Sequence, residues 1–263
     1  MDFVFVTVSV MFALLGVCVG SFLNVVVYRV PRGMSIANPP SHCTSCGHKL
    51  AWRDNIPLFS YIFLGGKCRY CHRPYSSRYF WVELLNGLLW LCCAFMYYDD
   101  LFLCSVFAVT LSVLLTMSLC DYDNLFIPDS LQIALAVVAI LSVWAFDEAE
   151  ILSKLWGLLG AGGFFLAFYG LSFVVFGREG MGFADVKLMA SLGFLLGWKY
   201  VSVAVIAGIV VALFDIALQN TLNKNKDMFT KPEYPFAPYL AWGGAFAIFF
   251  ASYVIDWYVT LFF

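Results

Sequence analysis

The residues of this chain that are best suited to chemistry include four cysteines arranged in two pairs. They read CTSC at 43–46 and CRYC at 68–71, with 21 residues between the pairs. Two such pairs can place four thiolates in a tetrahedron, which is the arrangement that zinc prefers in structural sites. We therefore predict a structural zinc site formed by Cys43, Cys46, Cys68 and Cys71.

Two alternatives to this four-cysteine site stay open on the sequence alone. The three histidines of the chain, His42, His48 and His72, lie in the same stretch and can replace a cysteine as ligand. The paired cysteines can also serve redox chemistry. A site with four protein thiolates leaves no open position for water, so the pattern favours structural zinc over catalytic zinc.

Carboxylates within apolar sequence form the second set of candidates, because ionisable groups in membrane segments are costly and mark functional sites. Asp121 ends an apolar stretch, where a carboxylate opposes the dipole of a helix C-terminus. Asp129 follows Pro128 and suits an ordinary helix start. Asp123 is either loop surface or a partner in the site. Asp121 is therefore the stronger candidate for chemistry.

Asp185 follows two glycines in the sequence Gly180-Met181-Gly182-Phe183-Ala184-Asp185. The stretch lacks the third glycine and the preceding strand of a dinucleotide-binding loop, and a carboxylate would repel phosphate, so we exclude nucleotide binding. Asp185 can simply cap a helix. However, it precedes Lys199 by 14 residues, or about 21 Å of helix against about 30 Å of hydrocarbon. The sequence thus indicates a glycine bend that places Asp185 below the membrane edge.

Composition fixes the class of protein that must position these residues. The chain has 263 residues, of which 62% are hydrophobic and 12% are charged, against about 45–50% and 25% in soluble domains. We predict an all-α polytopic membrane protein with about eight spanning helices and a small zinc-ribbon-like loop. The expected spans are residues 3–30, 79–98, 101–120, 129–146, 153–176, 186–198, 200–220 and 237–262.

Lysine and arginine are distributed unevenly among the connections between these spans. Eight of the 15 lie at or between the first two spans, and few lie in the connections on the opposite side. The positive-inside rule therefore places the 31–78 loop in the cytoplasm and the N-terminus on the outer side of the membrane. The predicted organisation is a first transmembrane helix at 1–30, a zinc-binding loop domain at 31–78 and a membrane core at 79–263.

Two aspartates in one partly dry pocket have a defined chemistry. The ionised carboxylate takes a proton from water, while the protonated one binds the scissile carbonyl, so that a peptide bond is hydrolysed without a metal. On this hypothesis Asp121 and Asp185 form the pair. Lys187 either supports the pair or extends to the lipid headgroups.

Several stretches of the chain together resemble a known family. They are GSFLNVVVYRVP at 20–31, the two cysteine pairs, NIPLFSYIFLGGKC at 55–68, SSRYFWVELLNG at 76–87, DYDNLFIPD at 121–129, GMGFADVKLMA at 180–190 and PFAPYLAWG at 235–243. In these stretches the chain is similar to bacterial type IV prepilin peptidases, which are intramembrane aspartic proteases and N-methyltransferases of the inner membrane.

The resemblance implies a function and its site residues. It implies cleavage of the leader of prepilins or pseudopilins after glycine at the cytoplasmic face, followed by N-methylation with S-adenosylmethionine. It assigns the second catalytic aspartate to Asp185, and the first to Asp121 in preference to Asp123. Glu83 becomes a candidate contact for the methyl donor, with a structural pair to Lys187 or a loop arginine as the alternative.

The same resemblance indicates the partners of the protein. They are the lipid bilayer, the pilin substrates and a pilus or type II secretion machinery, with no nucleic acid. A rival interpretation is a metal or proton transporter that uses Asp121, Asp185 and Asp215 as a relay and the zinc loop as a sensor. A second rival is an assembly scaffold without enzymatic activity.

Overall fold

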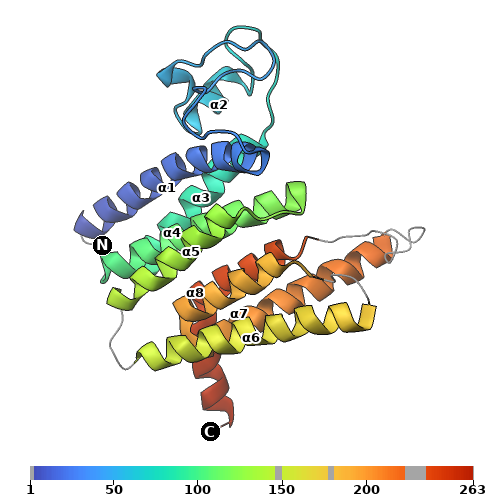
Figure 1. Cartoon of the computed structure of the whole chain (residues 1–263). Coiled ribbons are helices and arrows are strands. Elements are labelled where there is room, and N and C mark those ends of the chain that lie inside the picture. Colours follow the sequence, from blue (N-terminus) through green and yellow to red (C-terminus); the bar gives the residue numbers. More distant parts are fainter. Residues whose placement is uncertain (1–2, 146–149, 177–180, 223–234, 263) are drawn as a thin grey trace. The chain divides into compact units, whose positions relative to one another are not determined.

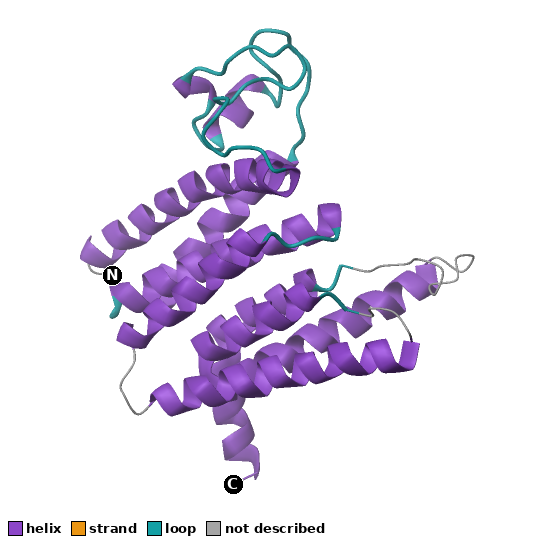
Figure 2. Cartoon of the chain, viewed as in Figure 1, coloured by secondary structure: helices purple, strands orange, loops and turns teal. Residues whose placement is uncertain are grey.

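The elements that carry the candidate residues are seen in a computed structural model of the chain (Figure 1), which describes residues 3–145, 150–176, 181–222 and 235–262. Within these residues the regular structure is helical, with only two isolated β-bridges and no named strand (Figure 2). Part of the expected glycine bend, at Gly180, lies outside the described residues. The predicted all-α class is confirmed.

The helices follow the apolar stretches of the sequence. Short 3-10 turns cover Val30–Arg32, Trp52–Asp54 and Ser142–Ala145. The α-helices are α1 (Phe3–Arg29), α2 (Phe59–Leu64), α3 (Arg78–Met96), α4 (Leu101–Asn124), α5 (Asp129–Leu141), α6 (Ile151–Phe176), α7 (Phe183–Leu222) and α8 (Ala237–Phe262).

The expected count of eight spans is too high. Six helices among the described residues are long and apolar enough to cross a membrane, and the segment Asp129–Trp144 is a shorter apolar helix. The expected spans 186–198 and 200–220 fall within one element, α7, because no proline or polar loop separates them in the sequence.

Helix α7 is interrupted at Gly197, whose φ of 74° and ψ of 168° are not helical. A straight helix of 40 residues would be about 60 Å long, twice the thickness of the hydrocarbon core. Gly243 of α8 lies against Ala204, which follows the interruption. The adjacent Gly244 lies against Leu192, which precedes it. The two halves of α7 therefore turn back along each other, and glycine is required at the turn because of its positive φ.

Lys154 of α6 stabilises this turn from inside the helix bundle. Its side chain is buried, and its Nζ donates hydrogen bonds to Ser142 Oγ and to the carbonyl oxygen of Leu195, both at 2.9 Å. Leu195 lies in the last turn before the interruption, where helix carbonyls lack partners within their own helix. A cation is favourable at such a helix end, so Lys154 has a structural reason to be buried.

The chain divides into two compact units, residues 1–108 and 109–263, and each is described by itself. In the first unit α1 packs on α3 (Figure 1) through Gly16 and Gly20, which are four residues apart. A Cβ at Gly16 would collide with Trp90, and Asn86 Nδ2 donates to the carbonyl oxygen of Gly16 at 2.7 Å. Small residues at this spacing allow close approach of membrane helices. Residues 33–77 of this unit, around α2, form a lobe of loops (Figure 2).

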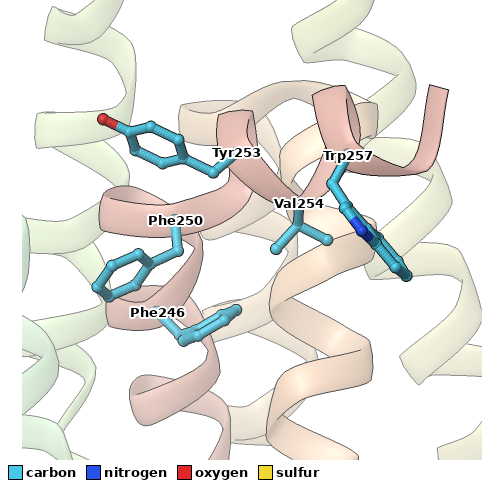
Figure 3. Close-up of a pocket in the computed structure, with 5 residues that line it drawn as sticks. All are labelled: Phe246, Phe250, Tyr253, Val254 and Trp257. Carbon is cyan, nitrogen blue, oxygen red and sulfur yellow. The ribbon is translucent and has the colours of Figure 1, made fainter. Parts of the chain in front are cut away.

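In the second unit, α7 packs on α6 and α8 through glycines. Gly157 of α6 faces Gly193 of α7, and a Cβ on either residue would collide with the backbone carbonyl of the other. The outer face of α8 carries aromatic side chains, of which Phe250, Tyr253 and Trp257 are exposed and Phe246 is half-buried (Figure 3). Exposed apolar and aromatic side chains on such a helix indicate a face that contacts lipid.

The glycine contact between α6 and α7 gives a stability prediction. We expect Gly157→Val to lower the free energy of unfolding by about 1–3 kcal/mol or more, because the backbone of α7 must move away. Gly160→Val is the matched control, since a Cβ at Gly160 meets nothing within 4 Å. Thermal unfolding in detergent compares the two variants. Equal loss of stability in both would show that the close helix contact is not the cause.

Candidate active site and metal-binding loop

Asp121 lies in the last turn of α4, and its side chain is buried. Its Oδ2 accepts a hydrogen bond of 3.0 Å from the backbone N–H of Ala237, the first residue of α8, and the N–H of Phe236 contributes a second one. The N-terminus of a helix attracts negative charge and presents free N–H groups. Asp121 is thus held at the end of α4 by the beginning of α8.

Asp185 lies in the first turn of α7 and is also buried, at 6% exposure. Its N–H donates to the carbonyl oxygen of Gly182 at 3.1 Å. A Cβ at Gly182 would lie 3.6 Å from Asp185 Oδ2. The residues Met181 and Gly182 are not helical, so α7 begins directly after the glycine segment. The carboxylate therefore lies next to the bend at the start of its helix.

The structure brings Asp121 and Asp185 together, close enough for their charges to interact. Both carboxylates are buried, whereas Asp123 is exposed. Residues two positions apart point to different faces of a helix, which explains why only one of the two aspartates in this turn lies near Asp185. A buried pair of carboxylates can act as general acid and general base.

Helix α5 contacts the segment that carries Asp185 at two points. Lys187 Nζ forms an ion pair of 2.7 Å with Asp129 Oδ1, on a surface where both side chains are exposed. Gln132 is buried, and its Nε2 donates to the carbonyl oxygen of Ala184 at 2.9 Å. The sequence left the role of Lys187 open and did not single out Gln132. A buried amide within the first turn of an apolar helix is the signal that would have identified Gln132.

Glu83 of α3 is a buried carboxylate that contacts the loop before α2. Its Oε2 accepts a hydrogen bond of 2.7 Å from the N–H of Leu58, and the hydroxyl group of Ser21 also donates a hydrogen bond to the carboxylate. Leu58 has a φ of 60°, which is unusual for a residue other than glycine. Glu83 therefore stabilises an unfavourable loop conformation, and the carboxylate is engaged by the protein itself.

The four cysteines of the loop converge as predicted. The Sγ atoms of Cys43, Cys46, Cys68 and Cys71 all lie within 4.8 Å of one another. Among the described residues, the group that can hold a metal ion consists of these cysteines without a histidine. The donor set is one that fits zinc, and a tetrahedral site of four thiolates is a closed structural site.

The two cysteine pairs have the same backbone geometry. The N–H of Gly47 donates to the carbonyl oxygen of Cys43 at 2.8 Å, and the N–H of His72 donates to that of Cys68 at 2.9 Å. Backbone N–H groups of Cys46 and Ser45 point to the Cys43 sulfur and lower the pKa of this thiol to about 6. A thiol that ionises readily is a good metal ligand, because metals bind the thiolate.

The loop contains one ion pair that the sequence analysis missed. Asp54 is buried, and its Oδ1 accepts a hydrogen bond of 2.6 Å from Nε of Arg69, which lies between Cys68 and Cys71. Burial disfavours the charge of Asp54, but Arg69 and the N–H of Ala51 outweigh this effect and lower the pKa of the carboxyl group. An acidic residue in a small loop domain carries no spacing signal, so its partner was not visible in the sequence.

Together, the fold and the site define a class: an all-helical, multi-pass membrane protein with a buried aspartate pair and a cysteine metal site. Comparison with known proteins narrows this class. Residues 14–97 match the model of the bacterial peptidase A24 N-terminal domain, and residues 108–216 match that of the type IV leader peptidase family. The chain belongs to the type IV leader peptidase family, and with it to the multi-pass proteins of the inner membrane.

Individual relatives agree with this assignment. The chain is 41% identical over 199 residues to a prepilin leader peptidase/N-methyltransferase of Myxococcus xanthus, covering 73% of this chain and 57% of the relative. It is 32% identical over 267 residues to a protein of the same name from Burkholderia pseudomallei, covering 90% of this chain and 84% of the relative. It is 31% identical over 260 residues to a protein of the same name from Pectobacterium carotovorum, covering 89% of this chain and 90% of the relative. No solved structure matches.

Proposed function

We propose that this protein cleaves the leader peptide of type IV prepilins or pseudopilins with Asp121 and Asp185, and N-methylates the new N-terminus. One observation supports the cleavage above all others: in a chain of this family, these two aspartates are buried together. Its relatives from Myxococcus xanthus and Burkholderia pseudomallei are named as peptidases and methyltransferases, and nothing supports the transporter or the scaffold interpretation.

The reaction that we propose is hydrolysis by water. The ionised carboxylate removes a proton as the water oxygen forms a bond to the scissile carbonyl carbon, and the protonated carboxyl group transfers its proton toward the carbonyl oxygen. The C–N bond then breaks, and the leaving amine takes a proton from the carboxyl group that accepted one. As the carbonyl group of the product re-forms, its hydroxyl group returns a proton to the other carboxylate. The pair returns to its starting state without a covalent intermediate.

We propose that both aspartates and the cysteine loop face the cytoplasm and that the N-terminus lies in the periplasm. The distribution of lysine and arginine supports this orientation. It places the carboxylates on the side where a basic leader precedes the hydrophobic helix of the substrate. A pilus or type II secretion machinery is the expected partner, since it receives the processed subunits.

Cys43, Cys46, Cys68 and Cys71 would hold zinc, and the ion would supply structural stability to the loop, because four thiolates fill its coordination. S-adenosylmethionine would supply the methyl group for the new N-terminus. Glu83 as a contact for this donor stays a prediction, and its engagement with Leu58 and Ser21 fits that role poorly.

The proposal is tested with the purified full-length protein in detergent and a full-length prepilin. We expect a shorter product that begins directly after the leader glycine, and mass spectrometry should find one added methyl group when S-adenosylmethionine is present. A folded protein that cleaves neither prepilins nor pseudopilins would refute the peptidase function. Cleavage without methylation would refute the second activity alone.

The ion pair of Lys187 gives a prediction with a small effect. Because Lys187 and Asp129 are exposed, their pair should contribute about 0–1 kcal/mol to stability. We expect Lys187→Gln and Asp129→Asn to cleave prepilin at rates within about threefold of the wild type, which corresponds to less than 1 kcal/mol. A rate assay with both variants measures this. A much larger loss in Lys187→Gln alone would place its ammonium group in the reaction.

A further inference from the structure

Asp215 is a carboxylate in the second half of α7 that the proposed reaction does not use. Its Oδ2 accepts a hydrogen bond of 2.6 Å from the hydroxyl group of Tyr239 and one of 2.8 Å from Nε2 of Gln219. Gln219 lies one turn further along the same helix, whereas Tyr239 belongs to α8. A hydrogen bond from a hydroxyl group to a carboxylate is short and strong, so this contact joins α7 firmly to α8.

Tyr239 lies in the same turn of α8 as the backbone that holds Asp121. Its N–H donates to the carbonyl oxygen of Phe236 at 3.1 Å, which closes this first turn. Ala237, whose N–H donates to Asp121, is fully buried, and Pro238 between them has no N–H of its own. The side chain of Tyr239 therefore attaches the first turn of α8 to Asp215. The backbone of the same turn holds Asp121.

The backbones of α7 and α8 are also close at this level. A Cβ at Gly208 would lie 3.0 Å from the carbonyl oxygen of Tyr239. The turn therefore has little room to move toward α7, while the hydroxyl group of Tyr239 prevents it from moving away from Asp215. These two restraints define the position of the N–H of Ala237 to which Asp121 is bonded.

We infer that Tyr239 and Asp215 are positioning residues for Asp121: they fix the first turn of α8, whose backbone N–H orients the Asp121 carboxylate. The inference rests on the proposed peptidase function. A reacting group must be held within a fraction of an ångström of its productive place, and a misplacement of about 1 Å can cost about 100-fold in rate. Loss of the Tyr239–Asp215 contact should therefore slow the chemical step and leave substrate binding nearly unchanged.

The test compares Tyr239→Phe, Asp215→Asn and the double variant with the wild type, using prepilin cleavage by the full-length protein in detergent. We expect kcat to fall about 10–100-fold in each single variant while KM stays within about twofold. The double variant should be no slower than the slower single variant, because both changes break one contact. Tyr253→Phe is the matched control, since it removes the hydroxyl group of an exposed tyrosine on the same helix (Figure 3).

Each outcome of this test is decisive. Unchanged kcat in Tyr239→Phe, losses that add up in the double variant, or an equal loss in Tyr253→Phe would overturn the inference. Thermal unfolding of each variant shows whether it is folded. If Asp215→Asn fails to fold, Tyr239→Phe, which removes a single oxygen atom, still decides. Failure of the wild type to cleave prepilin would instead refute the proposed function.

Discussion

Replacing Asp185 with asparagine is expected to reduce prepilin cleavage by about 1000-fold or more, and Asp121→Asn should have the same effect. Asparagine has the shape of aspartate. At position 121 its side-chain oxygen can still accept a hydrogen bond from the N–H of Ala237, so the helix contacts should persist. It cannot take a proton from water or return one to the leaving amine. The loss should therefore appear in kcat, measured with purified protein and prepilin in detergent.

Asp123→Asn is the matched control for this prediction, because Asp123 lies two residues from Asp121 and is exposed. We expect this variant to retain cleavage. Thermal unfolding of all three variants shows that the fold is intact. Loss of activity in Asp123→Asn together with normal activity in Asp121→Asn would transfer the first catalytic role to Asp123. Normal cleavage by Asp185→Asn would remove Asp185 from the mechanism.

The two aspartates illustrate how far the sequence can predict such a site. Each lies at a helix end in apolar sequence, where an ionisable side chain is costly, and this local feature singled them out. The sequence also indicated that Asp121 needs something to hold it against the helix dipole. It did not identify the N–H of Ala237, which lies more than a hundred residues further along the chain. Contacts over such distances depend on how the helices pack, and apolar helices carry little information about their neighbours.

The fold was predictable to a similar degree. Hydrophobic length located the helices to within a few residues, because a spanning segment must be apolar over most of its length. It divided the chain at residues 198–200, close to the turn at Gly197, but it did not reveal that the helical segments on both sides join directly as one element, α7. The roles of Gln132 and Asp54 were missed for the same reason: their hydrogen-bond partners come from other segments.

Cys68→Ser is expected to abolish metal binding and to unfold the cysteine loop. The four sulfur atoms lie within 4.8 Å of one another, and a structural zinc ion contributes about 10–16 kcal/mol of apparent binding free energy in small zinc domains. Serine is a poor zinc ligand, and Cys68 is the most buried of the four cysteines, so its loss should not be compensated by a neighbour. Elemental analysis should find about one zinc ion per chain in the wild type and almost none in the variant.

Limited proteolysis locates the effect in the loop, because trypsin can cut after Arg53, Lys67 or Arg69 once the loop unfolds. Cys92→Ser is the control, since Cys92 is an exposed cysteine on α3 outside the metal group. We expect it to keep its metal and to resist trypsin like the wild type. Full metal content in Cys68→Ser would contradict the four-cysteine site. A metal-free variant whose loop still resists trypsin would show that the ion does not stabilise this loop, and the buried pair of Asp54 and Arg69 would then have to maintain its fold.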